Sequence, residues 1–277
     1  MRVQFFRRLV LSCLLGCAAL TAQAQTTWTV GIVPQFPPEQ IFRTWSPILN
    51  ALAALTGERF ELRSFSSIPE FETAFLSGEV DLAYMNPYHA VMAYKAAGYV
   101  PIIRDGQRRL NGILVVRRDS PITEVRQLDG ATIAFPAPNA FGASLYMRAL
   151  LAKRERIDIV PVYVKTHSNV YRHVLTAQVE AGGGVRRTLE RETPRLREQL
   201  RVLYQTPDTP PHPLAAHPRV PSAVRSEIQA AFLRLANQPE TAALLAAVQI
   251  PKPVAASYQD YAALEELGLE NFVETPD

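Results

Sequence analysis

The chain has 277 residues, of which 48% are hydrophobic and 20% charged, so it is long enough to bury the core of one or two domains. Its formal net charge of +3 comes from three arginines near the amino terminus, and the remainder has 26 Lys+Arg (29 less these three) against 26 Asp+Glu. A neutral remainder gives no reason to expect nucleic acid or an anionic membrane as a partner.

Residues 1–24 have the pattern of a cleaved secretory signal. Three arginines precede an apolar core at residues 9–20, and residues 22–24 (Ala-Gln-Ala) form a small-x-small cleavage site. The apolar core has 12 residues, whereas a membrane-spanning helix needs roughly 20. We therefore predict export of the chain, with cleavage before Gln25.

Both cysteines, Cys13 and Cys17, lie within this predicted signal. After cleavage the chain has neither a disulfide nor a cysteine-based metal or redox site. The alternative is a lipoprotein signal, in which Cys17 follows Leu14-Leu15-Gly16 and is lipidated. Leu15 and the cleavage site downstream both count against this alternative.

Residues 25–110 alternate between strand and helix patterns and predict a first α/β unit with a largely parallel sheet. Strands are expected at residues 28–34, 59–65, 80–84 and 99–104. Ser46-Pro47 opens the first predicted helix and Gly57 ends it. Two more helices are expected after Ser66-Ser67 and after Asn86-Pro87.

Residues 75–91 carry the clearest signal in this unit. Gly78 is placed for the positive φ of a helix end, and Asn86-Pro87 supplies a capping side chain and a proline for the first helical position. Unpaired backbone N–H groups of the new helix then point beyond the carboxyl end of the strand. Ligands of open α/β sheets bind there, and free N–H groups favour an anion.

A second α/β unit spans residues 111–205, with strands expected at 111–117, 131–136 and 159–164. Helices are expected after Asn139 and after Thr166. Residues 186–201 are dense in alternating charge and are interpreted as a solvated helix rather than a functional patch.

Residues 206–277 begin with a proline-rich, linker-like passage and continue with two helical stripes that have little sign of their own core. Such helices must pack on an existing unit. Their return to the first unit predicts two chain crossings, near 107–112 and 203–210, and a hinge. The predicted division is residues 25–110 plus 206–277 for one lobe and 111–205 for the other.

No catalytic motif is convincing, since the chain has no nucleophile elbow, dinucleotide-binding glycine turn, P-loop or zinc-protease helix. Gly182-Gly183-Gly184 is interpreted as a tight strand end rather than an oxyanion loop. The five histidines are scattered, and His167 and His173 are expected on different sides of one helix. We predict no enzyme activity, no metal and no cofactor.

Four predicted helix N-termini follow strands and carry polar or aromatic residues, two of them in each unit. Ordinary capping is the alternative explanation for each one, but together they predict a cleft around a small anion. The candidate ligand-binding residues are Ser66, Ser67, Tyr84, Asn86, Tyr88, Asn139, Ala140, Phe141, Gly142, Ala143, His167 and Ser168.

Several of these stretches resemble one known family. They are residues 30–34 (Val-Gly-Ile-Val-Pro), 78–84 (Gly-Glu-Val-Asp-Leu-Ala-Tyr), Asn86-Pro87-Tyr88, residues 133–136 (Ile-Ala-Phe-Pro), and His167-Ser168 before Tyr171. The chain resembles the periplasmic substrate-binding proteins of phosphate, phosphite and phosphonate ABC transporters. The resemblance implies an α/β, two-lobed, type II-like periplasmic binding protein fold with two chain crossovers and a cleft that closes by hinge motion.

The resemblance also implies a periplasmic, non-catalytic protein that delivers a small oxyanion to an ABC permease, and nothing in the sequence demands more than a monomer. One departure concerns the ligand. Phosphonate binders usually have serine and threonine hydroxyls where this chain has Asn139-Ala140-Phe141-Gly142. That change favours a ligand with fewer oxygens, or one with an apolar portion against Phe141. His167 is expected to contribute charge.

Three alternatives stay open at this stage. The chain could report ligand occupancy to a membrane histidine kinase, or bind a small anion without phosphorus. It could also be an enzyme on the same scaffold, for which His167 and Glu180 are the residues to test.

Overall fold

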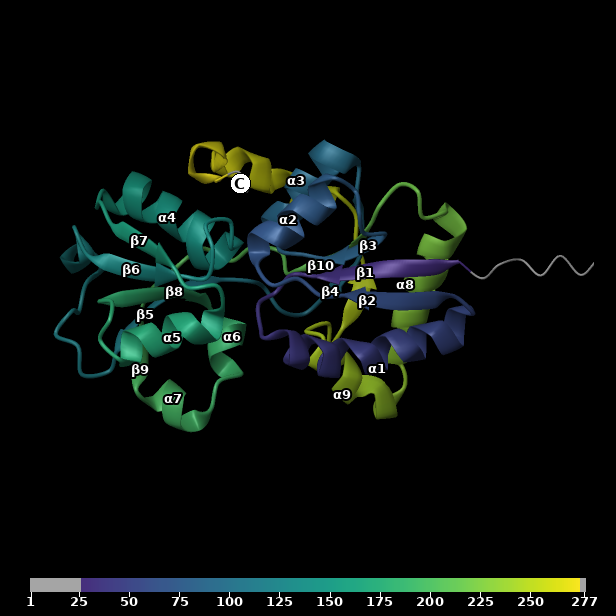
Figure 1. The fold of residues 1–277 in the computed structure, drawn as a ribbon, viewed down its shortest axis with the longest axis horizontal. Helices are drawn as coiled ribbons and strands as arrows, with labels where there is room; N and C mark the ends of the chain where they lie inside the picture. Colours follow the sequence, from purple (N-terminus) through teal and green to yellow (C-terminus); the bar gives the residue numbers. More distant parts are fainter. Residues whose placement is uncertain (1–25, 275–277) are drawn as a thin grey trace, which may run out of the picture.

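The computed structural model describes residues 26–274, so the predicted signal and Cys17 lie outside the described range. The chain forms two α/β lobes side by side, each built on one β-sheet (Figure 1). The predicted two-lobed fold is confirmed. Within residues 26–274, no helix is both long and apolar enough to cross a membrane.

The first lobe contains a six-stranded sheet in the order β11-β4-β10-β3-β1-β2. Strands β2 and β3 each pair with β1 in parallel, whereas β10 runs antiparallel to both β3 and β4. The strand bounds are β1 Thr27–Ile32, β2 Arg59–Arg63, β3 Leu82–Tyr84, β4 Val100–Asp105, β10 Pro213–Ala216 and β11 Pro253–Ala255.

Helices cover both faces of this sheet. In Figure 1, α2 and α3 lie on one face and α1 and α9 on the other. The helix bounds are α1 Pro38–Thr56, α2 Ile68–Leu76, α3 Pro87–Ala97, α8 Ser222–Ala236, α9 Ala242–Ala247 and α10 Gln259–Ala262, with 3₁₀ turns η4 Pro239–Thr241, η5 Ala263–Leu267 and η6 Glu270–Phe272.

The second lobe contains a five-stranded sheet in the order β7-β6-β8-β5-β9, where β6 is parallel to β7 and β8. One face packs on Met147 and Leu151, and the other on Val170, Tyr171 and Val174. The bounds are β5 Gly112–Arg117, η1 Val125–Leu128, β6 Thr132–Phe135, η2 Phe141–Leu145, α4 Tyr146–Leu150, η3 Leu151–Glu155, β7 Val160–Tyr163, α5 His167–Leu175, β8 Ala181–Val185, α6 Arg186–Glu190, α7 Pro194–Glu198 and β9 Leu200–Gln205.

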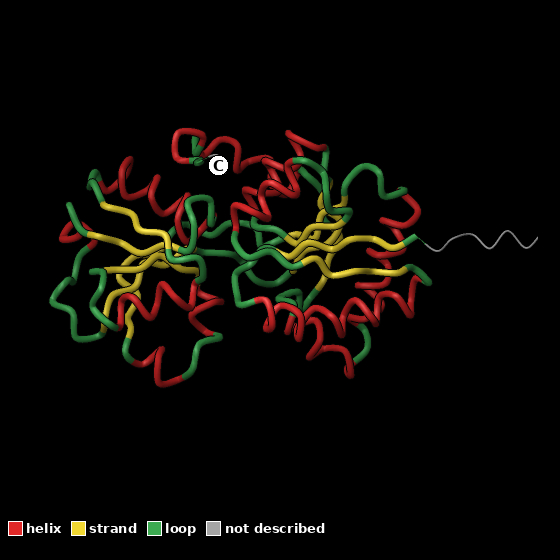
Figure 2. The backbone as a smooth tube through the Cα atoms, viewed as in Figure 1, coloured by secondary structure: helices red, strands yellow, loops and turns green. Residues whose placement is uncertain are grey.

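Two crossovers join the lobes, at residues 106–111 between β4 and β5 and at residues 206–212 between β9 and β10 (Figure 2). They lie side by side. Leu110 donates its N–H to Thr209 O at 2.9 Å, and Thr209 donates to Leu110 O at 2.8 Å. This short antiparallel bridge couples the two connecting segments where a hinge would bend.

Three of the helix starts predicted from capping residues are confirmed, whereas Asn139 does not cap the helix after it, since Ala140 is the N-cap of η2 and no side chain caps it. The side chains of Ser67, Asn86 and Thr166 each accept a hydrogen bond from the backbone N–H three residues later. Gly78 and Gly98 both have φ of 71°, as expected of helix ends.

The predicted start of α1 is wrong. The helix begins at Pro38 rather than at Ser46, because Pro38 occupies the first turn and Ile41 and Trp45 extend the buried stripe upstream. Pro47 lies inside the helix on its exposed side. A proline in a helix interior lacks one N–H donor, and solvent can satisfy the carbonyl left without a partner.

The single solvated helix predicted for residues 186–201 is also wrong. The stretch forms α6 and α7, broken before Thr193-Pro194, and then enters β9 at Leu200. Residues 206–277 were expected to add only helices to the first lobe, and this prediction is also incomplete. These residues also contribute β10 and β11, and all four residues of β10 are buried between β3 and β4.

Strand β8 contains Gly182-Gly183-Gly184 in the middle of the second sheet, because other parts of the lobe approach its backbone. A Cβ atom on Gly183 would overlap Ala143 O and the Phe135 ring, and one on Gly184 would overlap the Tyr171 hydroxyl. Gly112 makes a similar close approach to the backbone of Gly142. Glycine at position 142 is therefore accounted for by packing inside the chain.

Replacement of Gly183 by alanine should lower the free energy of unfolding by about 3 kcal/mol, because neither the Ala143 carbonyl nor the Phe135 ring can move away cheaply. Urea denaturation measures this loss. Gly57→Ala is the control. A Cβ there meets no atom within 4 Å, so only the strain at φ of 73°, about 1 kcal/mol, is expected. Equal losses in the two variants would contradict close packing at β8.

Candidate anion-binding site

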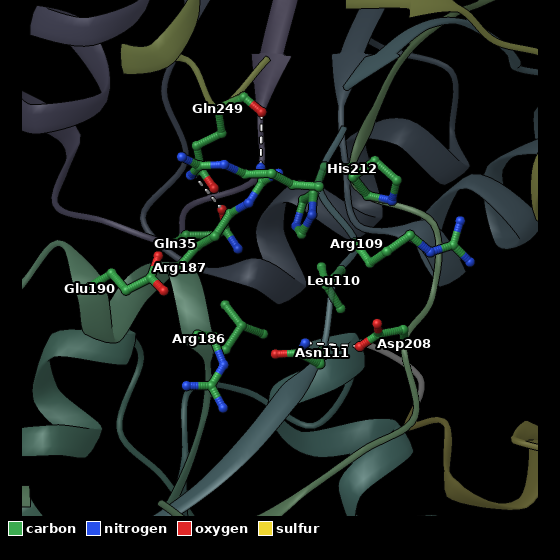
Figure 3. A pocket seen from close by; sticks show the side chains of 13 residues that line it. Gln35, Arg109, Leu110, Asn111, Arg186, Arg187, Glu190, Asp208, His212 and Gln249 are labelled. Carbon is green, nitrogen blue, oxygen red and sulfur yellow. Dashed lines mark hydrogen bonds between the residues drawn. The ribbon is translucent and has the colours of Figure 1, made fainter. Parts of the chain in front are cut away.

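The largest cavity described between the lobes lies beside the two crossovers and has a volume of about 430 Å³ (Figure 3). We call it the arginine-lined cavity, since four of its side chains are arginines from the first crossover and from α6. Its lining residues are Gln35, Arg108, Arg109, Leu110, Asn111, Val185, Arg186, Arg187, Glu190, Asp208, Pro211, His212 and Gln249.

Arg187 is the arginine of this cavity that bridges the lobes. It donates from Nη2 to Asp105 Oδ2 at 2.9 Å and from Nη1 to Gln249 O at 2.9 Å. Asp105 is fully buried at the end of β4, so the pair is shielded from solvent. The Arg187 Nε is buried without a hydrogen-bond partner among residues 26–274.

The other three arginines of the cavity have no carboxylate partner within the described chain. Arg186 donates to Gln205 Oε1 at 2.6 Å, and no hydrogen bond or ion pair of the described residues involves the side chains of Arg108 or Arg109. The lining contains two carboxylates, Glu190 and Asp208, and among the described residues neither forms an ion pair with these arginines.

Like charges crowd this side of the interface. Arg191 follows α6, donates to Ala246 O at 3.0 Å and Ala247 O at 2.7 Å, and lies over the Phe36 ring. Burial lowers the pKa of Arg191, and the charges of Arg187 and Arg108 lower it further. An anion between these groups would relieve that repulsion.

A second, much smaller cavity adjoins the first and shares Gln35, Leu110, Val185 and His212 with it. Its volume is about 10 Å³, roughly what the centre of one water molecule needs. We call it the inner cavity. Six of the twelve predicted ligand-binding residues line it, namely Asn86, Ala140, Phe141, Gly142, Ala143 and His167.

Tyr84 is buried behind these cavities. Its ring packs on Trp45 at 4.8 Å and on His212 at 5.5 Å between centroids, and its hydroxyl has no hydrogen-bond partner within residues 26–274. Burial raises the pKa of Tyr84 and lowers the pKa of His212 well below its ordinary value. Both side chains are therefore neutral near pH 7.

His167 occupies the first position of α5, directly after the capping residue Thr166. The ring is buried, its Nδ1 has no partner among the described residues, and burial lowers its pKa to about 3. The expectation that His167 supplies positive charge is therefore wrong for this conformation. A neutral ring can still donate one N–H to a ligand.

Asn139 joins the lobes on the side away from Arg187. Its Nδ2 donates to Glu72 Oε2 at 3.1 Å, and its carbonyl accepts from Asn86 Nδ2 at 3.2 Å. Glu72 also contacts His89 Nε2 at 2.7 Å, with both side chains inaccessible to solvent. The amide of Asn139 is therefore used in holding the lobes together.

The carboxyl-terminal segment strengthens this contact by reaching over the second lobe (Figure 1). Asn139 Nδ2 donates to Glu274 O at 2.6 Å, and Glu274 N donates back to Asn139 Oδ1 at 3.0 Å. Arg148 and Tyr163 contact the Glu274 carboxylate at 3.3 Å and 2.6 Å. The segment that ends the described range at Glu274 thus contacts the second lobe.

The remaining predicted residues do not line either cavity. Ser66 and Ser67 bind Glu70 at the start of α2, and Ser67 lies on a separate surface groove. Ser168 donates to Glu192 Oε1, and Tyr88 stacks on Phe141 across the interface at 6.1 Å. The structure therefore brings six predicted residues together and gives the others capping or packing contacts.

The arginines of the larger cavity were missed by sequence reasoning. Arg186 and Arg187 directly follow the carboxyl end of β8, so the rule that selected the other four strand–helix turns also applies to them. The density of nearby charge led to their interpretation as a solvated surface. Arg108 and Arg109 lie in the first predicted crossing, and no local pattern indicates that they face a cavity.

Within residues 26–274, no group of three or more His, Cys, Asp or Glu side chains is placed to hold a metal ion.

A protein-family model described as "ABC transporter, phosphonate, periplasmic substrate-binding protein" matches residues 30–261. Among curated proteins, the tetrathionate sensor histidine kinase TtrS of Salmonella typhimurium is 28% identical over 156 residues. The match covers 52% of this chain and 26% of the kinase, so the chain spans about a quarter of the length of that relative.

Solved structures show the same fold. A binding protein component of an ABC phosphonate transporter from Pseudomonas aeruginosa has a TM-score of 0.79 at 18% identity, covering 88% of this chain and 85% of that one. PhnD1 from Prochlorococcus marinus, solved with methylphosphonate, has a TM-score of 0.80 at 16% identity, covering 89% and 99%. A Xanthomonas citri protein solved with ATP has a TM-score of 0.72 at 18% identity, covering 90% and 98%.

The buried, neutral ring of His167 predicts that the folded protein loses stability against unfolding on mild acidification. His167 has an ordinary pKa of 6.5 when unfolded and about 3 when folded, so its contribution is complete above pH 6.5 and is lost as the pH falls toward 3. At pH 5 it should have lost about 2 kcal/mol. Urea unfolding at pH 7.5 and pH 5 should show a smaller loss in His167→Gln than in the original chain. An identical pH dependence in both proteins would contradict the neutral buried ring.

Asn139→Ala should favour opening of the lobes by about 1–3 kcal/mol, because the buried Glu72 loses a donor and the Glu274 backbone loses two hydrogen bonds. Small-angle scattering of the ligand-free protein should give a larger radius of gyration. Asn50→Ala, on the exposed face of α1, is the matched control and should leave the radius unchanged. An unchanged radius in Asn139→Ala would show that this contact does not hold the lobes together.

Proposed function

Because the chain belongs to the family of periplasmic substrate-binding proteins of phosphonate ABC transporters, we propose that it captures a phosphonate-like oxyanion between its lobes and delivers it to an inner-membrane permease. The family is a substrate-binding component of a transporter. We propose accordingly that this chain has no catalytic role.

The arginine-lined cavity is the observation that carries this proposal. It lies between the lobes at the hinge, and its four arginines outnumber its two carboxylates. Guanidinium groups suit phosphonate and related oxyanions, since each presents paired N–H donors to two oxygens. We propose that the anion enters while the lobes are apart and that Arg187, which already joins Asp105 to Gln249 O, completes the site on closure.

The inner cavity has a separate role in the proposal. Asn86, which caps α3, and His167, which begins α5, line it, and His167 offers a neutral donor. Its volume of about 10 Å³ in the closed arrangement leaves no room for an oxyanion, so binding there would require the lobes to separate slightly. The role of the six predicted residues around it remains a prediction.

We assign residues 25–110 and 206–277 to the first lobe and 111–205 to the second. The observed crossovers at 106–111 and 206–212 support these limits. Export through a cleaved signal at residues 1–24 and a monomeric state belong to the same proposal.

A ligand-sensing role is the second candidate, and the similarity to a tetrathionate sensor histidine kinase favours it. In that role the closed, anion-bound chain would contact a membrane kinase rather than a permease. Deletion of the gene separates the two. Transport predicts loss of uptake of the labelled ligand, whereas sensing predicts intact uptake and loss of a ligand-dependent transcriptional response.

An oxyanion panel tests capture directly. In thermal unfolding of the exported chain, at least one of methylphosphonate, phosphite, phosphate, sulfate or tetrathionate at 100 times its dissociation constant should add about 2.7 kcal/mol of stability. Neutral compounds of similar size, such as methanesulfonamide, are the control and should give no shift. A well-folded sample that responds to none of the anions would contradict the proposed function.

A further inference from the structure

The size of the arginine-lined cavity bears on the ligand class, on the premise that the proposed function is correct. A volume of about 430 Å³ equals that of roughly fourteen water molecules in the liquid. It falls in the range of about 300–1,000 Å³ typical of pockets for organic ligands. A one-carbon phosphonate would fill only a small part of it and leave most of the arginines solvated.

The cationic groups also stand on two sides of the cavity. Arg109 belongs to the first crossover, whereas Arg186 begins α6 of the second lobe. In Figure 3 their guanidinium groups lie on opposite sides of the view, with Leu110 between them. Two separated cations with an apolar side chain between them fit a ligand with an anionic group at each end and an apolar middle.

The lining also carries a net positive charge, since its four arginines face three carboxylates, those of Asp105, Glu190 and Asp208. Arg187 is matched by Asp105, but Arg108, Arg109 and Arg186 have no carboxylate partner in the described chain. Glu190 and Asp208 offset part of this excess, and Asp208 already accepts from Asn111 Nδ2 at 2.9 Å. The buried Arg187 Nε adds an unused donor to the same wall.

We infer that the ligand is an organic dianion, several atoms long, with an oxyanion group at each end and an apolar middle. It lies across the arginine-lined cavity, where Arg109 binds one end and Arg186 binds the other. Because these two residues come from the crossover and from the second lobe, such a ligand also ties the hinge to that lobe.

Isothermal titration of the exported chain with matched pairs tests this inference. The pairs are propane-1-sulfonate with propane-1,3-disulfonate, and butane-1-sulfonate with butane-1,4-disulfonate. Each dianion should bind at least about tenfold more tightly than its partner, since a second charge-assisted contact contributes about 1.5–3 kcal/mol. Because this comparison uses the unaltered chain, it holds even where a variant does not fold.

Substitutions then locate the two ends. Arg109→Gln and Arg186→Gln should each weaken dianion binding about tenfold or more and reduce the preference over the monoanion. Arg126→Gln removes the same charge from the exposed turn η1 and should change neither quantity.

The outcomes separate this inference from the function on which it rests. Equal affinity for the monoanion and dianion of each pair, or an unaltered preference in both cavity variants, would overturn the dianion assignment and leave oxyanion capture standing. Absence of binding to any anion, including the short ones, would overturn both.

Discussion

The positive charge held between the lobes is the constraint on which the rest of the structure depends. Four arginines lie beside one cavity between the lobes, and a cation loses stability when it is desolvated without a partner. The protein compensates one of these charges with a carboxylate, since Arg187 forms an ion pair with the buried Asp105. The other arginines depend on solvent or, in the proposed function, on a bound anion, which would link closure to anion binding through the same side chains.

Two sets of contacts hold the lobes together on either side of the cavities. Near the hinge, Arg187 and Arg191 reach β4 and α9 of the first lobe. On the far side, Asn139 contacts the buried Glu72 and the carboxyl-terminal segment at Glu274. An anion in the arginine-lined cavity would strengthen the first set directly, since it would bind the groups that lie next to it. This arrangement is what a binding protein needs if the ligand is to favour closure.

Local sequence rules predicted much of the fold because local groups determine those features. Asn86 and Thr166 cap helices through their own side chains, and Gly78 takes the positive φ that a helix end requires. The strands of residues 206–277 were missed for a nonlocal reason. Pro213 and its neighbours become a strand only because β3 and β4 hold them in register.

The site was predicted less completely than the fold, because it too depends on contacts between residues far apart in the sequence. Turns after strands were recognised, and six of their residues do meet at the inner cavity. The sequence cannot show whether such a turn faces ligand or the opposite lobe, and Asn139 contacts the opposite lobe. Arg108 and Arg186 are far apart along the chain and come together only because the crossover and α6 are neighbours in the folded protein.

The most direct test of this account is a crystal structure of the chain with the tightest-binding anion of the titration series. The account predicts closed lobes, with oxyanion groups of the ligand within hydrogen-bond distance of arginine guanidinium groups in the arginine-lined cavity. An anion bound only at the turns around Asn86 and His167, with the arginines in solvent, would contradict it.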